Sequence, residues 1–151
     1  MSDMPVCPQC GAVQQQGLSC EEAFHQMLYW EAENPANGAV HHLMVICYYL
    51  QHPRLYSPEG LAWGMKLLAD FLTGMTPAEM RTRMRVDVDS GSRRYKIGGT
   101  PASYGVYSHP IQWSHTAVRV VEAGPVCYCQ SVRAWAQAVY TDLRESGNLS
   151  N

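Results

Sequence analysis

The chain has 151 residues, of which 46% are hydrophobic, and its formal net charge is −2. This length and apolar content suffice for a buried core, so we expect one domain over residues 1–151. No stretch approaches the roughly twenty apolar residues of a transmembrane helix, and the slightly acidic balance argues against wholesale nucleic-acid binding. The first five residues carry no basic region and no apolar run, which favours a cytoplasmic protein over a secreted one.

The first motif along the chain is Cys7-Pro8-Gln9-Cys10-Gly11, a C-x-x-C turn. Two thiols at this spacing on a tight turn form half of a tetrahedral zinc site, and Cys20 offers a third thiolate. In a reducing compartment this spacing is more typical of metal binding than of disulfides. A thioredoxin-like redox motif would need a βαβ pattern around the cysteines, which the sequence does not show.

Two helices are predicted after this turn. A capping box at Ser19 and Glu22 starts a helix over 20–33. Apolar residues at helical spacing indicate a second helix over 39–51, which Pro53 ends. Because the first helix begins at Cys20, its N-terminus favours the thiolate that zinc requires.

Further helix signals follow in the middle of the chain. Ser57 and Pro58 open a third helix with two apolar stripes, so we expect it to be the most buried. A capping box at Thr76 and Glu79 starts a short helix that extends to about Arg85.

Residues 86–125 are rich in glycine and proline, and such a long irregular stretch suggests a functional loop. Within it, 94–97 and 116–121 are candidates for short strands. Apolar residues between 132 and 143 predict a C-terminal helix that ends near Gly147. The fold class is therefore mainly α: a small bundle of about five helices, with an N-terminal zinc-knuckle-like turn and a long irregular segment before the last helix.

The fourth metal ligand follows from the geometry of the first two helices. Each is about 13 residues or roughly 20 Å long, and a short connection favours an antiparallel hairpin. The start of the first helix then lies beside the end of the second, where His52 is found. The sequence therefore predicts a Zn²⁺ site made of four residues: Cys7, Cys10, Cys20 and His52.

Other potential ligands are weaker candidates. His25 shares a helix with Cys20 but lies on a different face, and His41 is at the far end of the hairpin. Cys47 lies on an apolar stripe and is expected in the core. The pair Cys127 and Cys129 could supply thiols, although one intervening residue is awkward for chelating one ion.

These residues resemble an uncharacterised bacterial family of small domains of unknown function. The resemblance rests on CPQCG at 7–11, the helix-start Cys20, VHHLMVICYYLQHP at 40–53 and VRAWA at 132–136. Members of that family show CPxCG and VHxLxVxxYxxQHP. The resemblance implies a metal-binding helical protein and supplies no activity.

The family motif contains His41 as well as His52, which makes His41 a candidate additional site residue. Either it makes a buried hydrogen bond at the hairpin tip, or it faces a groove.

Basic residues cluster within 81–96, which holds six of the eleven in the chain. Such a cluster is either a solvated loop or a contact with an acidic protein or a nucleic-acid backbone. The candidate partner-contact residues are Arg81, Arg83, Arg85, Arg93, Arg94 and Lys96.

The function favoured by these observations is a binding or adaptor module, or a subunit of a larger assembly, with a structural zinc ion and protein partners. The alternative is a zinc-dependent enzyme with an open coordination position, in which His41, His42 or Glu31 would act as base. The thiol-rich ligand set and the lack of H-E-x-x-H and deaminase patterns favour the module.

Overall fold

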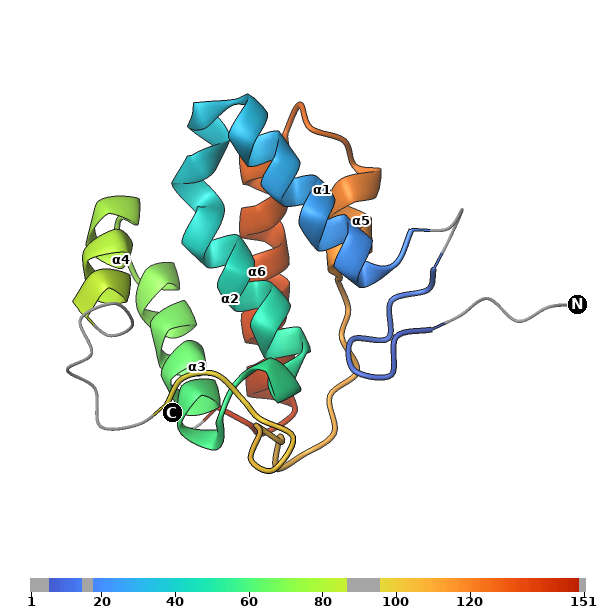
Figure 1. Ribbon diagram of the computed structural model, residues 1–151, viewed down its shortest axis with the longest axis vertical. Helices are drawn as coiled ribbons and strands as arrows, with labels where there is room; N and C mark the ends of the chain where they lie inside the picture. The colour runs from blue at the N-terminus through green and yellow to red at the C-terminus, as the bar shows by residue number, and fades with distance from the viewer. Residues whose placement is uncertain (1–5, 15–17, 87–95, 150–151) are drawn as a thin grey trace, which may run out of the picture.

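The computed structural model describes residues 6–14, 18–86 and 96–149. These residues form a small, mainly helical bundle, which confirms the predicted fold class (Figure 1). Within the same three ranges no β-strand occurs, and β pairing is confined to isolated bridges. The elements in chain order are α1 (Cys20–Glu33), η1 (Pro35–Val40), α2 (His41–Gln51), η2 (Pro53–Leu55), α3 (Pro58–Leu72), α4 (Pro77–Met84), α5 (Ala117–Glu122) and α6 (Tyr128–Glu145), where η denotes a 3-10 helix.

Three helices begin where the capping residues predict. The side chains of Ser19, Ser57 and Thr76 each accept a hydrogen bond from the backbone N–H three residues later, at the starts of α1, α3 and α4. The second helix begins two residues later than expected, because residues 35–40 form the 3-10 helix η1 instead. No helix in the described ranges is long and apolar enough to span a bilayer.

The centre of the bundle is α2, which packs against both α3 and α6 (Figure 1). Seven of its eleven residues are buried, against five of fifteen in α3. The expectation that the third helix is the most buried is therefore wrong. The reason is positional: α2 is enclosed by neighbours on several sides, whereas α3 presents one face to α2 and α6.

The second of the two predicted strands is a helix. Residues 117–122 form α5, which packs on α1 and buries Ala117, Val118 and Val120. The β-branched valines at alternate positions suggested a strand, and tertiary packing overrides that propensity. The other predicted strand, 94–97, lies partly outside the described residues, and Lys96 and Ile97 within it are not in a strand.

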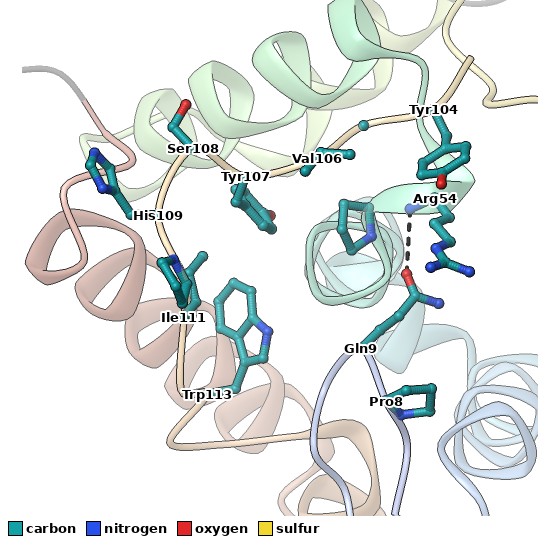
Figure 2. A pocket seen from close by; sticks show the side chains of 13 residues that line it. Pro8, Gln9, Arg54, Tyr104, Val106, Tyr107, Ser108, His109, Ile111 and Trp113 are labelled. Carbon is teal, nitrogen blue, oxygen red and sulfur yellow. Dashed lines mark hydrogen bonds between the residues drawn. The ribbon is translucent and has the colours of Figure 1, made fainter. Parts of the chain in front are cut away.

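Residues 96–113, which we call the strap, cross the turn that follows α2. Gly99 N–H donates to Leu55 O at 2.9 Å, and Gly105 N–H donates to Tyr56 O at 2.7 Å. A Cβ atom on these glycines would lie 2.3 and 2.8 Å from backbone oxygens, so only glycine permits this approach. The strap thereby runs past the η2 turn and the N-terminal loop, as Figure 2 shows.

Candidate metal centre

The N-terminal C-x-x-C segment folds as a compact knuckle. Cys7 N–H donates to Ala12 O at 3.0 Å, and Gly11 N–H donates to Cys7 O at 2.9 Å. Gly11 has a φ of 74°, a conformation that glycine adopts without strain. Ala12 N–H points at Cys10 Sγ, 3.4 Å away. The turn therefore directs both thiols to one side and provides an N–H donor to one of them.

Two helix ends supply the remaining side chains. Cys20 is the first residue of α1, directly after the cap Ser19, and His52 is the residue that ends α2. His52 Nδ1 lies 2.7 Å from Tyr48 O, and the two rings are 4.2 Å apart. Because a carbonyl can only accept, Nδ1 carries a proton, and Nε2 is the ring nitrogen that faces the sulfur atoms.

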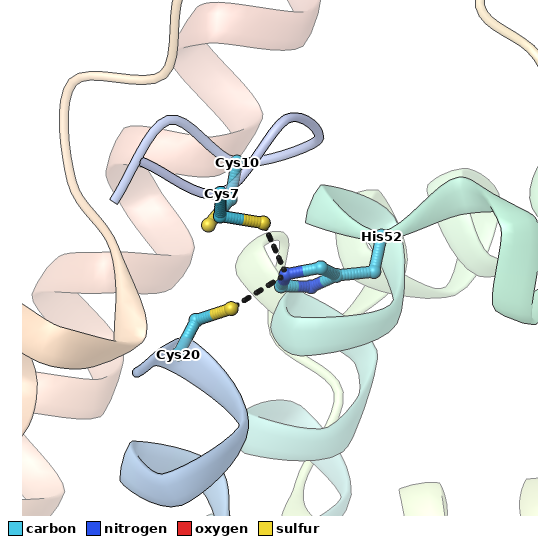
Figure 3. Close-up of side chains that lie close together, drawn as sticks. All are labelled: Cys7, Cys10, Cys20 and His52. Carbon is cyan, nitrogen blue, oxygen red and sulfur yellow. Dashed lines mark hydrogen bonds between the residues drawn. The ribbon is translucent and has the colours of Figure 1, made fainter. Parts of the chain in front are cut away.

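The four donor atoms converge, as Figure 3 shows. The Sγ atoms of Cys7, Cys10 and Cys20 and the ring nitrogen of His52 all lie within 4.8 Å of one another. Two of the separations are 3.6 Å for Cys7 Sγ and 3.3 Å for Cys20 Sγ, each to His52 Nε2. Zinc bonds of about 2.3 Å to sulfur and about 2.0 Å to nitrogen, at tetrahedral angles, would place S and N about 3.5 Å apart. The chemistry and spacing of this group, the Cys3His cluster, therefore fit a metal ion.

The thiols of the cluster differ in acidity. Hydrogen bonds from Cys10 and His52 lower the pKa of Cys20 to about 4. The pKa of Cys10 is raised, first by its hydrogen bond to Cys20 and second by burial. The thiolate form of Cys20 is thus already favoured. Cys10 and His52 are buried, whereas Cys7 and Cys20 are half-buried. A cation among them would stabilise the further thiolates that burial alone disfavours.

His41 lies outside the cluster, at the opposite end of α2. Its Nδ1 is 2.6 Å from a carboxylate oxygen of Glu31, and Tyr128 donates its hydroxyl proton to the other oxygen. This hydrogen-bonded group, the Glu31 triad, joins α1, α2 and α6. Glu31 raises the pKa of His41. The structure thus gives His41 a hydrogen bond at the hairpin tip, and eleven residues of helix, roughly 16 Å, separate it from His52.

The remaining candidate ligands lie apart from the cluster. His25 is exposed on α1, and Cys47 is buried in the core, where desolvation raises its pKa. Cys127 is exposed just before α6, and Cys129 Sγ lies 3.7 Å from the backbone oxygen of Ala36. All six cysteines are free thiols.

The basic residues of 81–96 do not form one surface in the described part of the chain. Arg81, Arg85 and Lys96 are exposed. Arg83 is half-buried, and its guanidinium lies 3.3 Å from Asp70. Outside the described residues lie Arg93 and Arg94.

Gln51 is a positioning residue that the sequence reasoning missed. Its side chain is fully buried, donates to His115 O at 2.6 Å and accepts from Trp135 Nε1 at 3.2 Å. These bonds fix the end of α2, and therefore His52, against α6 and the segment before α5. The sequence feature that could have identified Gln51 is its position: an amide side chain at the end of an apolar helix, directly before the candidate ligand His52.

Comparisons with known proteins place the whole bundle in one sequence family. A family model described as "Family of unknown function (DUF5946)" matches residues 5–144. The match contains the Cys3His cluster, and it confirms the resemblance to an uncharacterised family. No curated protein and no solved structure matches the chain.

Proposed function

We propose that this chain, which belongs to the family of unknown function DUF5946, is a binding module stabilised by one structural Zn²⁺. The observation that carries the proposal is the convergence of three sulfurs and one imidazole nitrogen within 4.8 Å. Thiolate and imidazole ligands favour zinc over magnesium or calcium, which prefer oxygen. The predicted ligands are Cys7, Cys10, Cys20 and His52.

The ion would act as a fastener between three segments that are distant in sequence. The knuckle, the start of α1 and the end of α2 each contribute to the cluster. Among the contacts that join these segments, those of Cys20 Sγ and Cys7 Sγ to His52 Nε2 are long, at 3.3 and 3.6 Å. Metal binding of this kind contributes directly to the free energy of folding. A rigid N-terminal knuckle then becomes one wall of a surface that a partner can recognise.

A module is favoured over an enzyme by the ligand set, because Cys3His is typical of closed structural sites. Closed shells leave no position for a reacting water. Two of the three residues expected to act as base in the enzyme alternative, Glu31 and His41, pair with each other at the far end of α2. The third, His42, lies at that same end.

One observation favours the enzyme alternative. A cavity of about 240 Å³ adjoins the cluster and is lined by Cys7, Cys20 and Glu21, among others. A ligand exchanged at this side of the ion would be open to solvent, and Glu21 would be the nearest carboxylate on that wall.

The experiment that separates the two functions is substitution of the metal by Co²⁺, whose visible absorption reports coordination. We expect one zinc ion per purified chain and, after exchange, the intense bands of tetrahedral thiolate-bound Co²⁺. Azide, which occupies open positions, should leave the bands unchanged. A shift with azide would support the enzyme, and a chain that lacks zinc and melts at the same temperature with and without chelator would overturn the metal centre.

A further inference from the structure

A second feature of the molecule lies beside the knuckle. A groove of about 580 Å³ is bounded by the knuckle (Pro8, Gln9), the η2 turn (Pro53, Arg54) and the strap residues 104–111 and 113 (Figure 2). This volume is within the range of about 300–1,000 Å³ that ligand sites occupy. The knuckle and the turn are held to each other, because Arg54 N–H donates to the side-chain oxygen of Gln9 at 3.4 Å.

The walls of the groove are aromatic and fixed. The rings of Tyr107 and Trp113 meet edge-on with centroids 5.9 Å apart. Tyr107 is held in place because its hydroxyl donates to Leu50 O in α2. Val106 contributes an apolar side chain that is 72% exposed. Rigid aromatic walls of this kind bind flat apolar groups, among them the pyrrolidine rings of an extended, proline-rich chain.

Two polar groups of the groove, the Arg54 guanidinium and the Trp113 indole N–H, could pair with a bound ligand. Arg54 lies over the ring of Tyr104, 5.3 Å from its centroid, and among the described residues no carboxylate forms an ion pair with it. The indole N–H of Trp113 faces the space toward Gln9 in Figure 2 and has no hydrogen-bond acceptor in the part of the chain that the structure describes. The lining contains no Asp or Glu. The groove is therefore complementary to an anionic ligand that also offers a carbonyl oxygen.

We propose that this groove binds an extended, proline-containing acidic segment of a partner protein. The inference rests on the proposed function as a binding module and names its partner by chemistry. A polyproline II segment makes no internal hydrogen bonds, so its carbonyls are free to accept from Trp113 Nε1. Proline rings pack against the exposed faces of Tyr107 and Trp113, and a carboxylate of the segment pairs with the Arg54 guanidinium.

The test uses a fluorescein-labelled peptide of four Pro-Pro-Glu triplets and the zinc-loaded full chain, with binding followed by fluorescence anisotropy. Two matched probes carry Pro-Pro-Lys, which reverses the charge, and Gly-Ser-Glu, which keeps the charge and removes the prolines. We expect the Pro-Pro-Glu probe to bind at least about tenfold more tightly than either.

Variants locate the site. Arg54→Gln should weaken binding of the Pro-Pro-Glu probe by about tenfold, because it removes the only guanidinium in the lining. Trp113→Phe should weaken it by about fivefold, because it removes the N–H donor and keeps a ring. Arg133→Gln, on the exposed face of α6, is the matched control and should change nothing. Zinc content and far-ultraviolet circular dichroism verify that each variant is folded.

Three results would overturn the proposal: no binding of Pro-Pro-Glu by folded, zinc-loaded protein, equal binding of the three probes, or equal losses in Arg54→Gln and Arg133→Gln. Each of these leaves the metal-stabilised module standing if zinc is retained and azide leaves the Co²⁺ spectrum unchanged. Loss of zinc from the wild-type chain would instead count against the proposed function itself.

Discussion

The two ends of α2 each carry a histidine with a fixed ring, and they differ in what fixes it. His52 donates its Nδ1 proton to the neutral backbone oxygen of Tyr48, 2.7 Å away. His41 directs its Nδ1 at the carboxylate of Glu31, 2.6 Å away. The first arrangement holds the ring with Nε2 facing three sulfurs, whereas the second raises the pKa of His41 and favours an imidazolium that pairs with an anion.

This contrast explains how one helix can hold two histidines of one motif in different roles. A metal ligand presents the lone pair of Nε2 to the ion, and a carbonyl partner at Nδ1 orients the ring for that role. A carboxylate partner raises the pKa of the ring, which opposes metal binding. The hydrogen-bond partner of Nδ1, rather than the histidine itself, therefore distinguishes the Cys3His cluster from the Glu31 triad.

Cys10→Ser tests the Cys3His cluster most severely. Because the cluster would lose one of three thiolates, we expect loss of zinc and a fall of at least about 3 kcal/mol in the free energy of unfolding, or roughly 6–12 °C in Tm. Elemental analysis and thermal unfolding measure both. Cys127→Ser is the control, since that thiol is exposed and outside the cluster. Unchanged zinc content and Tm in Cys10→Ser would refute the assignment.

Substitutions of His52 and His41 should differ in their effect on zinc affinity. His52→Ala should weaken zinc binding by at least about tenfold, because it removes the imidazole from the shell. His41→Ala should leave the affinity unchanged, because that ring pairs with Glu31. Titration against a competing chelator measures both. The reverse order would show that the ends of α2 have been assigned the wrong way round.

Tyr128→Phe probes the Glu31 triad alone. Tyr128 is buried, and its hydroxyl donates to a carboxylate whose side chain is only 7% exposed. Loss of a hydrogen bond to a charged group should cost about 1.5–3 kcal/mol of unfolding free energy, with zinc content unchanged. Tyr140→Phe, on the same helix and half-buried, should stay within about 0.5 kcal/mol in denaturant unfolding. Equal effects of the two changes would mean that the buried hydroxyl contributes nothing specific.

The smallest expected effect is a pH dependence at His41. Glu31 raises the pKa of His41 above about 6.5, so the stability from this pair is present below that pH and is lost as pH rises through the folded pKa. The His41 side chain is 41% exposed, so we expect less than about 1 kcal/mol. The neighbouring His42 ring, 5.1 Å away, would reduce the effect when protonated.

The measurement compares the unfolding free energy of the wild type and His41→Gln in denaturant at pH 6 and pH 9, both zinc-loaded. The wild type should exceed the variant at pH 6, and the difference should shrink at pH 9. A difference that grows with pH would contradict the sign of the shift.

Much of the fold could be predicted because its signals are local. Ser19, Ser57 and Thr76 marked three helix starts through side-chain capping, which depends only on the next three residues. The grouping of the cluster residues also followed from local facts, since a short connection brings the start of α1 near the end of α2. The juxtaposition of Cys20 and His52 therefore required only helix lengths and a turn.

The rest depends on contacts between distant segments, which residue spacing does not encode. The sequence of residues 117–122 favours a strand, but in the structure these residues form a helix that packs against α1. From the sequence, Gln51 is simply a polar residue at a helix end; its role depends on the hydrogen bond from Trp135, 84 residues later. The aromatic groove exists only because the strap crosses the turn after His52. Tertiary neighbours decide each of these cases, not propensity.

All four side chains of the Cys3His cluster are encoded before residue 53. Ribosomes add about 5–20 residues per second, so the last donor, His52, is synthesised roughly 4–17 s before Trp135. All four proposed ligands therefore exist in the nascent chain before α6 does. During that interval the side of α2 that packs against α6 in the folded chain has no such cover.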